Sequence, residues 1–328
     1  MTLLPITLAC GPYDRTRALA DGRVRVEGAD LRYIQLDPEE IFFRMLSYGE
    51  FDVAELSFSS YVLTHLADGP FVAVPVFPSR MFRHTSVYVS ESSGITSPAQ
   101  LAGRLVGVAE YQLTANVWIR GILEEYHGLA SSSVRYRTGG LNEQGRLEKI
   151  PLKLPSEIDI EPIPDGATLS GMLAAGEIDA IYSPRAPASF DAGNGVRRLF
   201  TDSRARERQY FRDSGIFPIM HVLVMRREVY EANPWLATSL AKAFSLAKNF
   251  AYQELARTVA LAVTLPWVRE EYEASVGLLG DDFWSYGLDA NRHVIETFIR
   301  YAHEQGMLSR RPEPEELFAK ETLKSVII

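Results

Sequence analysis

Two histidines on apolar stretches are the side chains of this sequence best placed for proton transfer. His84 opens the stretch His84–Ser90, and His221 lies within Ile219–Met225. Imidazole can act as an acid or a base near neutral pH, because its ordinary pKa lies there. A single histidine on an apolar strand is more often structural, but two in matching positions favour a functional pair. We therefore predict that His84 and His221 are catalytic.

Arginines, hydroxyl groups and carboxylates stand close to the ends of predicted strands. Ligands of open α/β sheets bind at the carboxyl ends of strands, and an arginine offers a planar fork that matches a carboxylate. The residues concerned are Tyr13, Arg15 and Arg17 after the first strand, Glu55 and Ser57 at the end of the third, Arg80 and Arg83 before His84, Glu110, Tyr111 and Thr114 between a strand and a helix, and Arg185 between two prolines. Free amides at the start of that helix would add to the attraction for an anion. This set predicts a small dianionic substrate, although any single arginine could equally be a solvated surface charge.

Signatures of common cofactors and metal sites are absent from the sequence. It contains no glycine-rich dinucleotide motif, no Walker-type loop, no HExxH, no paired CxxC and no GxSxG. We therefore expect no cofactor, and a divalent metal held by histidine and glutamate stays an alternative. The single cysteine, Cys10, could be a nucleophile, but a small core residue is its more common role.

A ten-residue pattern that occurs twice indicates the frame that carries these residues. Met45–Ala54 recurs 127 positions later as Met172–Ile181, with Gly, Glu, an apolar residue and Asp in the same order. Each copy is typical of the last turn of an amphipathic helix, a glycine that ends it and a short buried strand. The offset is too long for a solenoid repeat. Chance recurrence is the alternative, and two lobes of similar construction are the interpretation that we adopt.

Predicted strands and helices alternate along most of the chain, as in βαβ units with mostly parallel sheets. The strands are expected at residues 3–10, 31–36, 52–57, 71–77, 84–90, 105–109, 134–137, 158–163, 178–183 and 219–226. The helix from Pro38 is well marked, since Asp37 can cap it and Gly49 can end it. Further helices are expected at 234–254, 268–279, 290–305 and from Glu313, whereas Thr138–Pro155 lacks periodicity and is expected to be a loop.

The two histidine-bearing strands bracket the middle of the chain and could be crossovers between the lobes. Lobe one would then comprise residues 1–85 and 222–328, and lobe two residues 86–221. We expect the active site in a cleft between the lobes, since ligands favour such places.

Composition and charge exclude some classes of partner. The 328 residues suit two lobes, and a content of 46% hydrophobic and 23% charged residues is typical of a soluble globular protein. A formal net charge of −8 argues against nucleic acid and against an anionic membrane as partners. The N-terminus has neither a basic flank nor a long apolar run, and no segment approaches a membrane span. We expect a cytoplasmic protein, and a homo-oligomer is compatible with the sequence.

Several long stretches resemble the 4,5-dihydroxyphthalate decarboxylase family. They are Tyr13–Leu19, Phe82–Ser86, Glu110–Trp118, Ser183–Pro187, Gly215–His221, Asp281–Gly287 and Asn291–His293, so the likeness extends over essentially the whole chain. The resemblance implies a two-lobed α/β fold similar to the type II periplasmic binding proteins, in which each lobe is a mixed sheet flanked by helices and two crossover strands join the lobes. It also implies loss of one carboxylate from 4,5-dihydroxyphthalate, or a closely related hydroxylated aromatic acid, to give protocatechuate and CO2.

In that substrate each carboxylate is para to a hydroxyl group. Removing the phenol proton pushes electron density to the carboxylate-bearing carbon, and protonating that carbon lets CO2 leave as the ring recovers aromaticity. On this hypothesis His84 and His221 are the acid and the base, in either order, and Glu55 or Glu110 orients an imidazole or accepts the phenol proton. The candidates for binding the second carboxylate are Arg15, Arg17, Arg80, Arg83 and Arg185.

Two other functions are compatible with the same fold. A solute-binding protein for transport or sensing would bind an aromatic acid without chemistry. A ligand-sensing domain of a regulator would accompany a DNA-binding segment, which the sequence lacks. The paired histidines and the lack of a signal peptide favour the enzyme.

Overall fold

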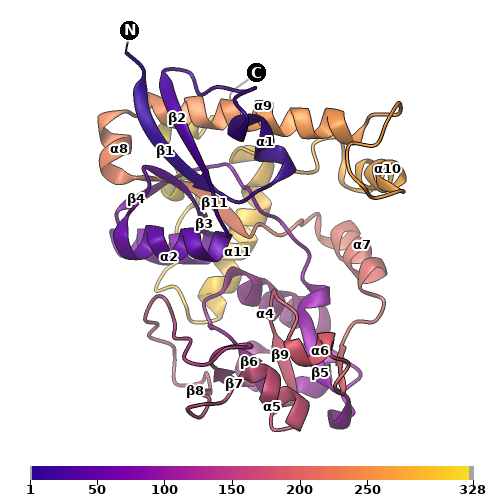
Figure 1. Cartoon of the computed structure of the whole chain (residues 1–328). Helices are drawn as coiled ribbons and strands as arrows, with labels where there is room; N and C mark the ends of the chain where they lie inside the picture. Colours follow the sequence, from indigo (N-terminus) through magenta and orange to yellow (C-terminus); the bar gives the residue numbers. More distant parts are fainter. Residues whose placement is uncertain (1, 325–328) are drawn as a thin grey trace. The chain divides into compact units, whose positions relative to one another are not determined.

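A computed structural model describes residues 2–324, which form two compact units (Figure 1). Unit 1 comprises residues 2–80, 219–296 and 312–324, and unit 2 comprises residues 81–218 and 297–311. His84 thus belongs to unit 2 and His221 to unit 1, the reverse of their places in the lobe boundaries expected from the sequence. Residues 297–311 also differ from that expectation, because Phe298 and Tyr301 pack against Trp118 of unit 2.

Unit 1 is built on a five-stranded mixed sheet in the order β2-β1-β3-β11-β4. The strands are β1 (Leu4–Cys10), β2 (Ala29–Gln35), β3 (Val53–Ser57), β4 (Phe71–Val74) and β11 (His221–Arg226). β1 pairs in parallel with β2 and β3, whereas β11 runs antiparallel between β3 and β4. Because β11 is antiparallel, its first residue, His221, lies at the same end of the sheet as the last residues of β1 and β3.

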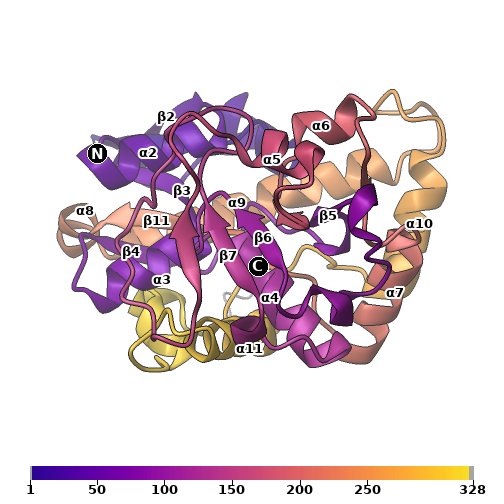
Figure 2. The same cartoon turned by 90° about the horizontal axis from the view of Figure 1, so that it is seen from below.

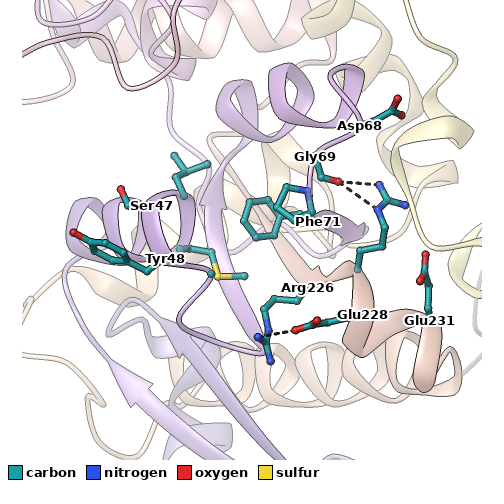
Figure 3. A pocket seen from close by; sticks show the side chains of 13 residues that line it. Ser47, Tyr48, Asp68, Gly69, Phe71, Arg226, Glu228 and Glu231 are labelled. Carbon is teal, nitrogen blue, oxygen red and sulfur yellow. Dashed lines mark hydrogen bonds and ion pairs between the residues drawn. The ribbon is translucent and has the colours of Figure 1, made fainter.

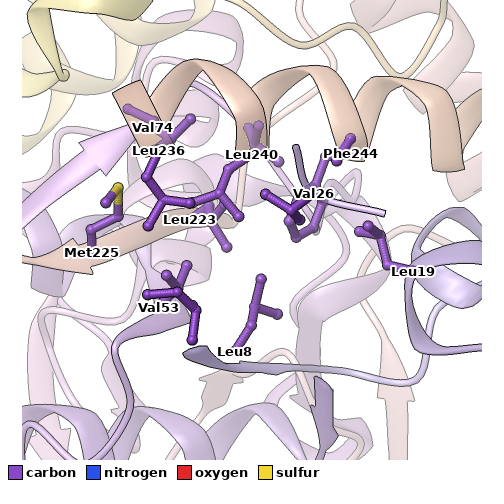
Figure 4. Packing of buried hydrophobic residues seen from close by; sticks show 14 of the residues in the cluster. Leu8, Leu19, Val26, Val53, Val74, Leu223, Met225, Leu236, Leu240 and Phe244 are labelled. Atoms are coloured by element: carbon purple, nitrogen blue, oxygen red, sulfur yellow. The ribbon is translucent and has the colours of Figure 1, made fainter. Parts of the chain in front are cut away.

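Helices pack on this sheet and fix its strands. They are α1 (Asp14–Ala20), α2 (Pro38–Tyr48), α3 (Phe58–Leu66), α8 (Arg227–Ala232) and α9 (Trp235–Leu255). A further helix, α10 (Val268–Leu279), packs against α9. The long helix α9 directs Leu236, Leu240 and Phe244 at helical spacing onto Leu8 and Leu223 of the sheet (Figure 4). Burying one such side chain is worth about 1.5–3 kcal/mol. This core therefore holds β1 and β11 in fixed positions under α9.

Unit 2 contains a six-stranded mixed sheet in the order β10-β5-β9-β6-β7-β8, and Figure 2 shows β6 and β7 side by side. The strands are β5 (Val87–Ser90), β6 (Leu105–Val108), β7 (Arg135–Thr138), β8 (Ile160–Pro162), β9 (Ala180–Tyr182) and β10 (Val196–Arg198). β5 runs antiparallel to β9 and β10, and the other pairs are parallel. The mixed sheet that the resemblance implied for each lobe is confirmed.

The helices of unit 2 are α4 (Thr114–His127), α5 (Leu169–Ala175), α6 (Ala188–Asp191), α7 (Ser203–Ser214) and the later part of α11 (Arg292–Glu304). Short 3-10 turns occur at His84–Ser86, Glu91–Ser93, Pro98–Leu101 and Ser131–Ser133, and in unit 1 at Asp289–Asn291, Pro314–Leu317 and Lys320–Thr322. In the described part of the chain, no helix is long and apolar enough to cross a membrane. The cytoplasmic location stays a prediction.

The repeated sequence pattern occupies equivalent places in the two units. The first copy ends α2 and leads into β3, and the second ends α5 and leads into β9. Gly49 and Gly176 end their helices with left-handed backbones, at φ of 57° and 73°. A side chain would be strained there, which explains the glycine. The interpretation of the pattern as a helix-to-strand unit present once in each lobe is confirmed.

The aspartate of each copy binds the parallel strand beside it. Asp52 Oδ2 accepts a hydrogen bond from Thr7 N at 2.8 Å, and Asp179 Oδ2 accepts one from Leu105 N at 3.0 Å. Both carboxylates thus bind a backbone amide of a neighbouring strand, β1 in unit 1 and β6 in unit 2. The aspartate therefore fixes the alignment of two strands in each unit.

Most predicted elements are present within a few residues of their expected bounds. The helix from Pro38 has Asp37 as its N-cap, whose side chain accepts from Glu39 N at 2.9 Å. Three details of the prediction are wrong: residues 84–86 form a 3-10 turn instead of strand, β4 ends at Val74, and both β10 and α7 were missed. The segment Thr138–Pro155 contains no helix or strand beyond the end of β7, as expected.

Candidate active site

Glu55 is the centre of a hydrogen-bonded cluster within unit 1. Its side chain is fully buried on β3. Oε1 accepts from the Tyr13 hydroxyl at 2.8 Å and lies 2.6 Å from Nδ1 of His221. Oε2 accepts from the backbone N–H of Gly11 at 2.9 Å and from the Cys10 thiol at 3.4 Å. Four donors therefore converge on one carboxylate.

Strand geometry explains why these residues meet. Glu55 follows Val53 by two residues, so both point to the sheet face that α9 covers. Leu223 lies directly opposite Glu55 in the register, and His221 is two residues before Leu223. Such diagonal neighbours on adjacent strands are within reach of long side chains. Glu55 and His221 are therefore distant in the sequence and become neighbours through the register of β11 on β3.

Glu55 is ionised in spite of its burial. Burial alone raises the pKa of a carboxyl group, but the hydrogen bond and charge of His221 lower it, as do the Gly11 N–H and the Tyr13 hydroxyl. The pKa of Glu55 accordingly lies below its usual value. An ionised carboxylate can only accept, so the proton on Nδ1 of His221 is directed at Glu55. Nε2 of His221, on a side chain that is 18% exposed, is then the atom available for proton transfer.

Close packing restricts the movement of the cluster. The edge of the Phe42 ring lies against the His221 imidazole, with centroids 4.8 Å apart. Gly11 has no room for a side chain, because a Cβ there would lie 2.6 Å from the Tyr13 ring. The imidazole and the Tyr13 hydroxyl are therefore held in place before any ligand binds, which favours catalysis by positioned groups.

Arg15 lies beside this cluster and contacts two aromatic rings. Its Cζ is 4.1 Å from the centre of the Tyr13 ring and 4.0 Å from that of Trp284. Nε donates to the Pro78 carbonyl oxygen at 2.6 Å, and Nη1 lies 3.3 Å from Asp14 Oδ1. Within residues 2–324, Nη2 has no hydrogen-bond partner. This nitrogen can therefore bind a carboxylate of a ligand.

The other candidates of unit 1 have different surroundings. Arg17 is exposed and lies 3.5 Å from Glu254. Arg80 is buried and donates to the Ser285 carbonyl oxygen at 2.8 Å, and burial lowers its pKa to about 10. Ser57 is the N-cap residue of α3, without a capping hydrogen bond from its side chain. Of the predicted residues in unit 1, the structure joins Glu55, His221, Tyr13 and Arg15 in one cluster.

His84 has the environment of a packing side chain. Its ring is 4% exposed in unit 2 and lies 5.4 Å from that of Phe200 and 5.5 Å from that of Tyr210. Burial, followed by the positive charges of His127 and Arg206, lowers its pKa to about 4. Its buried Nδ1 has no hydrogen-bond partner in the described structure. His84 is therefore neutral at physiological pH.

Glu110 is held by two cations of unit 2. Oε1 accepts from Arg146 Nη2 at 2.7 Å and from Lys149 Nζ at 2.9 Å, and Oε2 accepts from Gln112 at 3.2 Å. Burial alone would raise the pKa of Glu110. The positive charges and hydrogen bonds of Lys149 and Arg146 lower it by more, so the pKa lies below its usual value. These contacts attach the loop of residues 139–159 to the end of β6. A role of Glu110 in the chemistry stays a prediction.

Four further candidates belong to unit 2. Tyr111 is buried, and its hydroxyl donates to the Gln305 carbonyl oxygen at 3.3 Å. Thr114 is the buried first residue of α4. Arg83 is buried, which lowers its pKa to about 10, whereas Arg185 is exposed between β9 and α6. Substrate binding by these residues stays a prediction.

Glu148, in the loop that Glu110 holds, is expected to make the stability of the protein dependent on pH. Tyr111 N donates to Oε1, but Oε2 is buried without a partner among the described residues. Burial and the negative charge of Glu110 raise the pKa of Glu148 to about 7. Because this pKa is higher in the folded than in the unfolded protein, Glu148 stabilises the folded state at pH values below its pKa in the unfolded chain. That contribution to stability is lost as pH rises through about 7.

Replacing Glu148 with glutamine is therefore expected to stabilise the protein by about 1–3 kcal/mol near pH 8, with little effect near pH 5. The glutamine keeps an acceptor for Tyr111 N and cannot become charged. Urea unfolding of the variant and the wild type at both pH values measures the difference. Glu143→Gln, at an exposed position of the same loop, is the matched control. Equal stability of Glu148→Gln and the wild type at the higher pH would contradict the expectation.

Within residues 2–324, neither a metal-binding group of side chains nor the cavity of unit 1 is a better candidate than the Glu55 cluster. Residues 2–324 contain no group of three or more His, Cys, Asp and Glu side chains arranged to hold a metal ion. A metal in the reaction stays an untested alternative. Unit 1 has a cavity of about 620 Å³ between α2, β4 and α8 (Figure 3), but it lies at the far end of β11 from His221. Its Arg226 contacts Glu228 at 2.8 Å, and its Arg227 donates to Gly69 O at 3.0 Å.

Sequence reasoning missed two residues of the site. Phe42 was assigned only to the apolar face of its helix, and Trp284 lay in a stretch that carried the family resemblance without a role of its own. Spacing gives no signal for either, because both meet the site through contacts distant in the sequence. The interpretation of Cys10 as a core residue is confirmed, since it is fully buried and burial, with the charge of Glu55, raises its thiol pKa well above the usual value.

Two known proteins resemble this chain, one of them over nearly its whole length. It is 46% identical over 327 residues to the 4,5-dihydroxyphthalate decarboxylase of Comamonas testosteroni, covering 99% of each protein. It is 50% identical over 214 residues to the 4,5-dihydroxyphthalate decarboxylase of Pseudomonas putida, covering 65% of this chain and 83% of that protein. No family model matches the chain.

Solved structures share its fold at low sequence identity. The periplasmic aliphatic sulphonate binding protein SsuA of Escherichia coli has a TM-score of 0.53 at 15% identity, covering 98% of this chain and 99% of that one. SsuA of Xanthomonas axonopodis pv. citri has a TM-score of 0.54 at 11% identity, covering 97% and 99%. The desulfurization enzyme DSZB has a TM-score of 0.50 at 16% identity, covering 98% and 97%. These likenesses confirm the two-lobed periplasmic-binding-protein-like fold. The identity of 46% over 99% of the chain shows that the chain belongs to the 4,5-dihydroxyphthalate decarboxylase family.

Proposed function

We propose that this protein is a carboxy-lyase that converts 4,5-dihydroxyphthalate to protocatechuate and CO2, with the Glu55–His221 pair as its proton donor. The observation that carries the proposal is a buried, ionised carboxylate hydrogen-bonded to an imidazole whose other nitrogen is available to a ligand. A family relationship supports the substrate, since both named relatives are 4,5-dihydroxyphthalate decarboxylases.

The position of Arg15 indicates which proton transfer His221 performs. Arg15 packs on the Tyr13 ring, and the Tyr13 hydroxyl binds the same carboxylate oxygen as His221. A substrate whose retained carboxylate binds Arg15 therefore has its carboxylate-bearing carbons close to His221. The para hydroxyl groups lie across the ring from those carbons. We assign protonation of the ring carbon to His221 for this reason.

His221 and Glu55 of unit 1, together with solvent, account for the proton transfers of this step. Nε2–H of His221 gives its proton to the ring carbon that carries the leaving carboxylate, and a C–H bond forms. The bond to that carboxylate then breaks, its electron pair restores the aromatic ring, and CO2 leaves. Glu55 stabilises the positive imidazolium before the transfer, as a carboxylate does for a catalytic histidine. Solvent returns a proton to His221 and takes the phenol proton, since Glu110 is paired with cations and His84 is buried.

Incubation with 4,5-dihydroxyphthalate tests this function directly. We expect CO2 release and a change in ultraviolet absorbance, with protocatechuate as the product. In D2O the product should carry one deuterium at the ring position that lost its carboxylate, which NMR detects. Tight binding of unchanged substrate would contradict the enzyme and favour a solute-binding protein, and a panel of related acids would measure specificity.

A further inference from the structure

Trp284 is held in place by contacts on three sides. Its indole Nε1 donates to the Phe77 carbonyl oxygen at 2.9 Å, and its backbone N donates to the Tyr252 hydroxyl at 2.8 Å. Its carbonyl oxygen accepts from Lys248 Nζ at 3.3 Å. The ring thus fixed contacts the Arg15 guanidinium at 4.0 Å. The indole is therefore a rigid surface against which Arg15 rests.

The residues on either side of Trp284 are also anchored. Lys248 is only 4% exposed and pairs with Asp282, whose carboxylate also accepts from the Tyr252 hydroxyl at 3.1 Å. The buried Arg80 donates to the carbonyl oxygen of Ser285 at 2.8 Å. Burying an ammonium and a guanidinium is costly unless both are well paired. Lys248 and Arg80 are buried and bind the residues on both sides of Trp284. Their contacts therefore fix the position of the turn that carries Trp284.

Tyr13 connects Arg15 to the proton donor. One end of Tyr13 binds Glu55 through its hydroxyl, and its ring supports the Arg15 guanidinium. Trp284 and the Pro78 carbonyl oxygen fix the guanidinium from other directions and leave Nη2 unpaired within the described residues. The spacing between the anion-binding nitrogen and the Glu55–His221 pair is therefore set by Tyr13 together with Trp284.

We propose that Trp284 is a positioning residue that holds Arg15 in the orientation in which it binds the retained carboxylate of the substrate. This inference rests on the proposed function, since it assumes a substrate with a second carboxylate. An arginine that is already ordered loses less conformational freedom when it binds. The retained carboxylate is bound before and during the reaction alike, so loss of Trp284 should raise KM and change kcat little.

Two substitutions separate the aromatic face from the hydrogen bond of Trp284. Both Trp284→Leu and Trp284→Phe remove the Nε1–H that binds the Phe77 carbonyl, but only phenylalanine keeps a ring for Arg15. We expect Trp284→Leu to raise KM about 5- to 30-fold and Trp284→Phe to stay within about threefold of the wild type. kcat should remain within about threefold in both variants.

Two inhibitors distinguish loss of carboxylate binding from general damage. Phthalate has both carboxylates but no hydroxyl groups, and catechol has the hydroxyl groups but no carboxylate. The inhibition constant of phthalate should rise with KM in Trp284→Leu, whereas that of catechol should not change. In an Arg15→Met background, Trp284→Leu should have no further effect on phthalate, because the group that it positions is gone.

Three results would overturn the inference: an unchanged KM in Trp284→Leu, an equal rise in both Trp284 variants, or an equal loss of phthalate and catechol binding. Failure of the proposed function is a separate result, namely no CO2 release by the wild type. Calorimetric titration with phthalate needs no turnover. Phthalate binding that depends on Arg15 and Trp284 would therefore support the positioning role even in a protein without decarboxylase activity.

Discussion

Replacing His221 with asparagine is expected to lower kcat about 10²- to 10⁴-fold at neutral pH, the usual contribution of a positioned proton donor. Asparagine can still donate to Glu55 from the place of Nδ1, but it has no group in the place of Nε2. The fold should persist, because His221 pairs with β3 through its backbone and its side chain is partly exposed. Steady-state kinetics of the variant and the wild type, measured at the same neutral pH, give the effect on kcat.

His84→Asn is the matched comparison, since it removes the other predicted catalytic histidine. We expect it to change kcat per folded molecule by no more than about threefold, because the pKa of His84 near 4 keeps the imidazole neutral in the working range. The melting temperature should fall, since the ring loses its contacts with Phe200 and Tyr210. Near wild-type turnover in His221→Asn together with a large loss in His84→Asn would reverse the assignment.

Local signals in the sequence were sufficient for most of the fold. The helix from Pro38 has an N-cap aspartate, an apolar face and a terminal glycine, and all three appear in the structure. Helix α7 was missed because only Tyr210 among its residues is buried, so it has no apolar stripe to detect. β10 was missed because a three-residue edge strand of Val-Arg-Arg has no alternating pattern. Both missed elements thus lack the apolar periodicity on which the prediction of helices and strands depends.

The sequence was sufficient to identify residues of the candidate site, but not to predict which of them bind one another. Glu55 was identified because it stands at the end of a predicted strand, where ligands of open α/β sheets bind. Its pairing with His221, which is 166 positions away, depends on the insertion of β11 between β3 and β4. The order and register of the strands in the folded sheet decide such contacts, and neither can be read from a single sequence. The two histidines therefore looked equivalent, although one faces a carboxylate and the other faces aromatic rings.

The repeated pattern shows where the two units differ chemically. Three residues after the repeated aspartate, β3 carries Glu55 and β9 carries Tyr182. Glu55 receives four donors, whereas the Tyr182 hydroxyl is buried without a partner among the described residues. The aspartates bind neighbouring strands in both units. The pattern thus describes a shared scaffold, and only its first copy carries the carboxylate of the proposed Glu55–His221 pair.

Replacing Glu55 with glutamine is expected to lower kcat about 10²- to 10⁴-fold, although the two side chains have the same shape. Gly11 N–H can only donate, so the glutamine oxygen must face it. The glutamine NH2 group then faces Tyr13 and Nδ1 of His221. Nδ1 becomes an acceptor, the proton of the neutral imidazole moves to Nε2, and no carboxylate remains to stabilise the imidazolium that protonates the ring.

The change of tautomer makes this prediction specific. The ¹⁵N chemical shifts of the His221 imidazole should show the proton on Nε2 in Glu55→Gln and on Nδ1 in the neutral wild type. Asp52→Asn is the control, because it removes a carboxylate next to the same strand, β3. Asp52 binds Thr7 and Arg226 and not the histidine. That control should keep kcat within about threefold while losing stability. If Glu55→Gln instead kept near wild-type kcat, Glu55 would be a structural carboxylate and His221 would act without it.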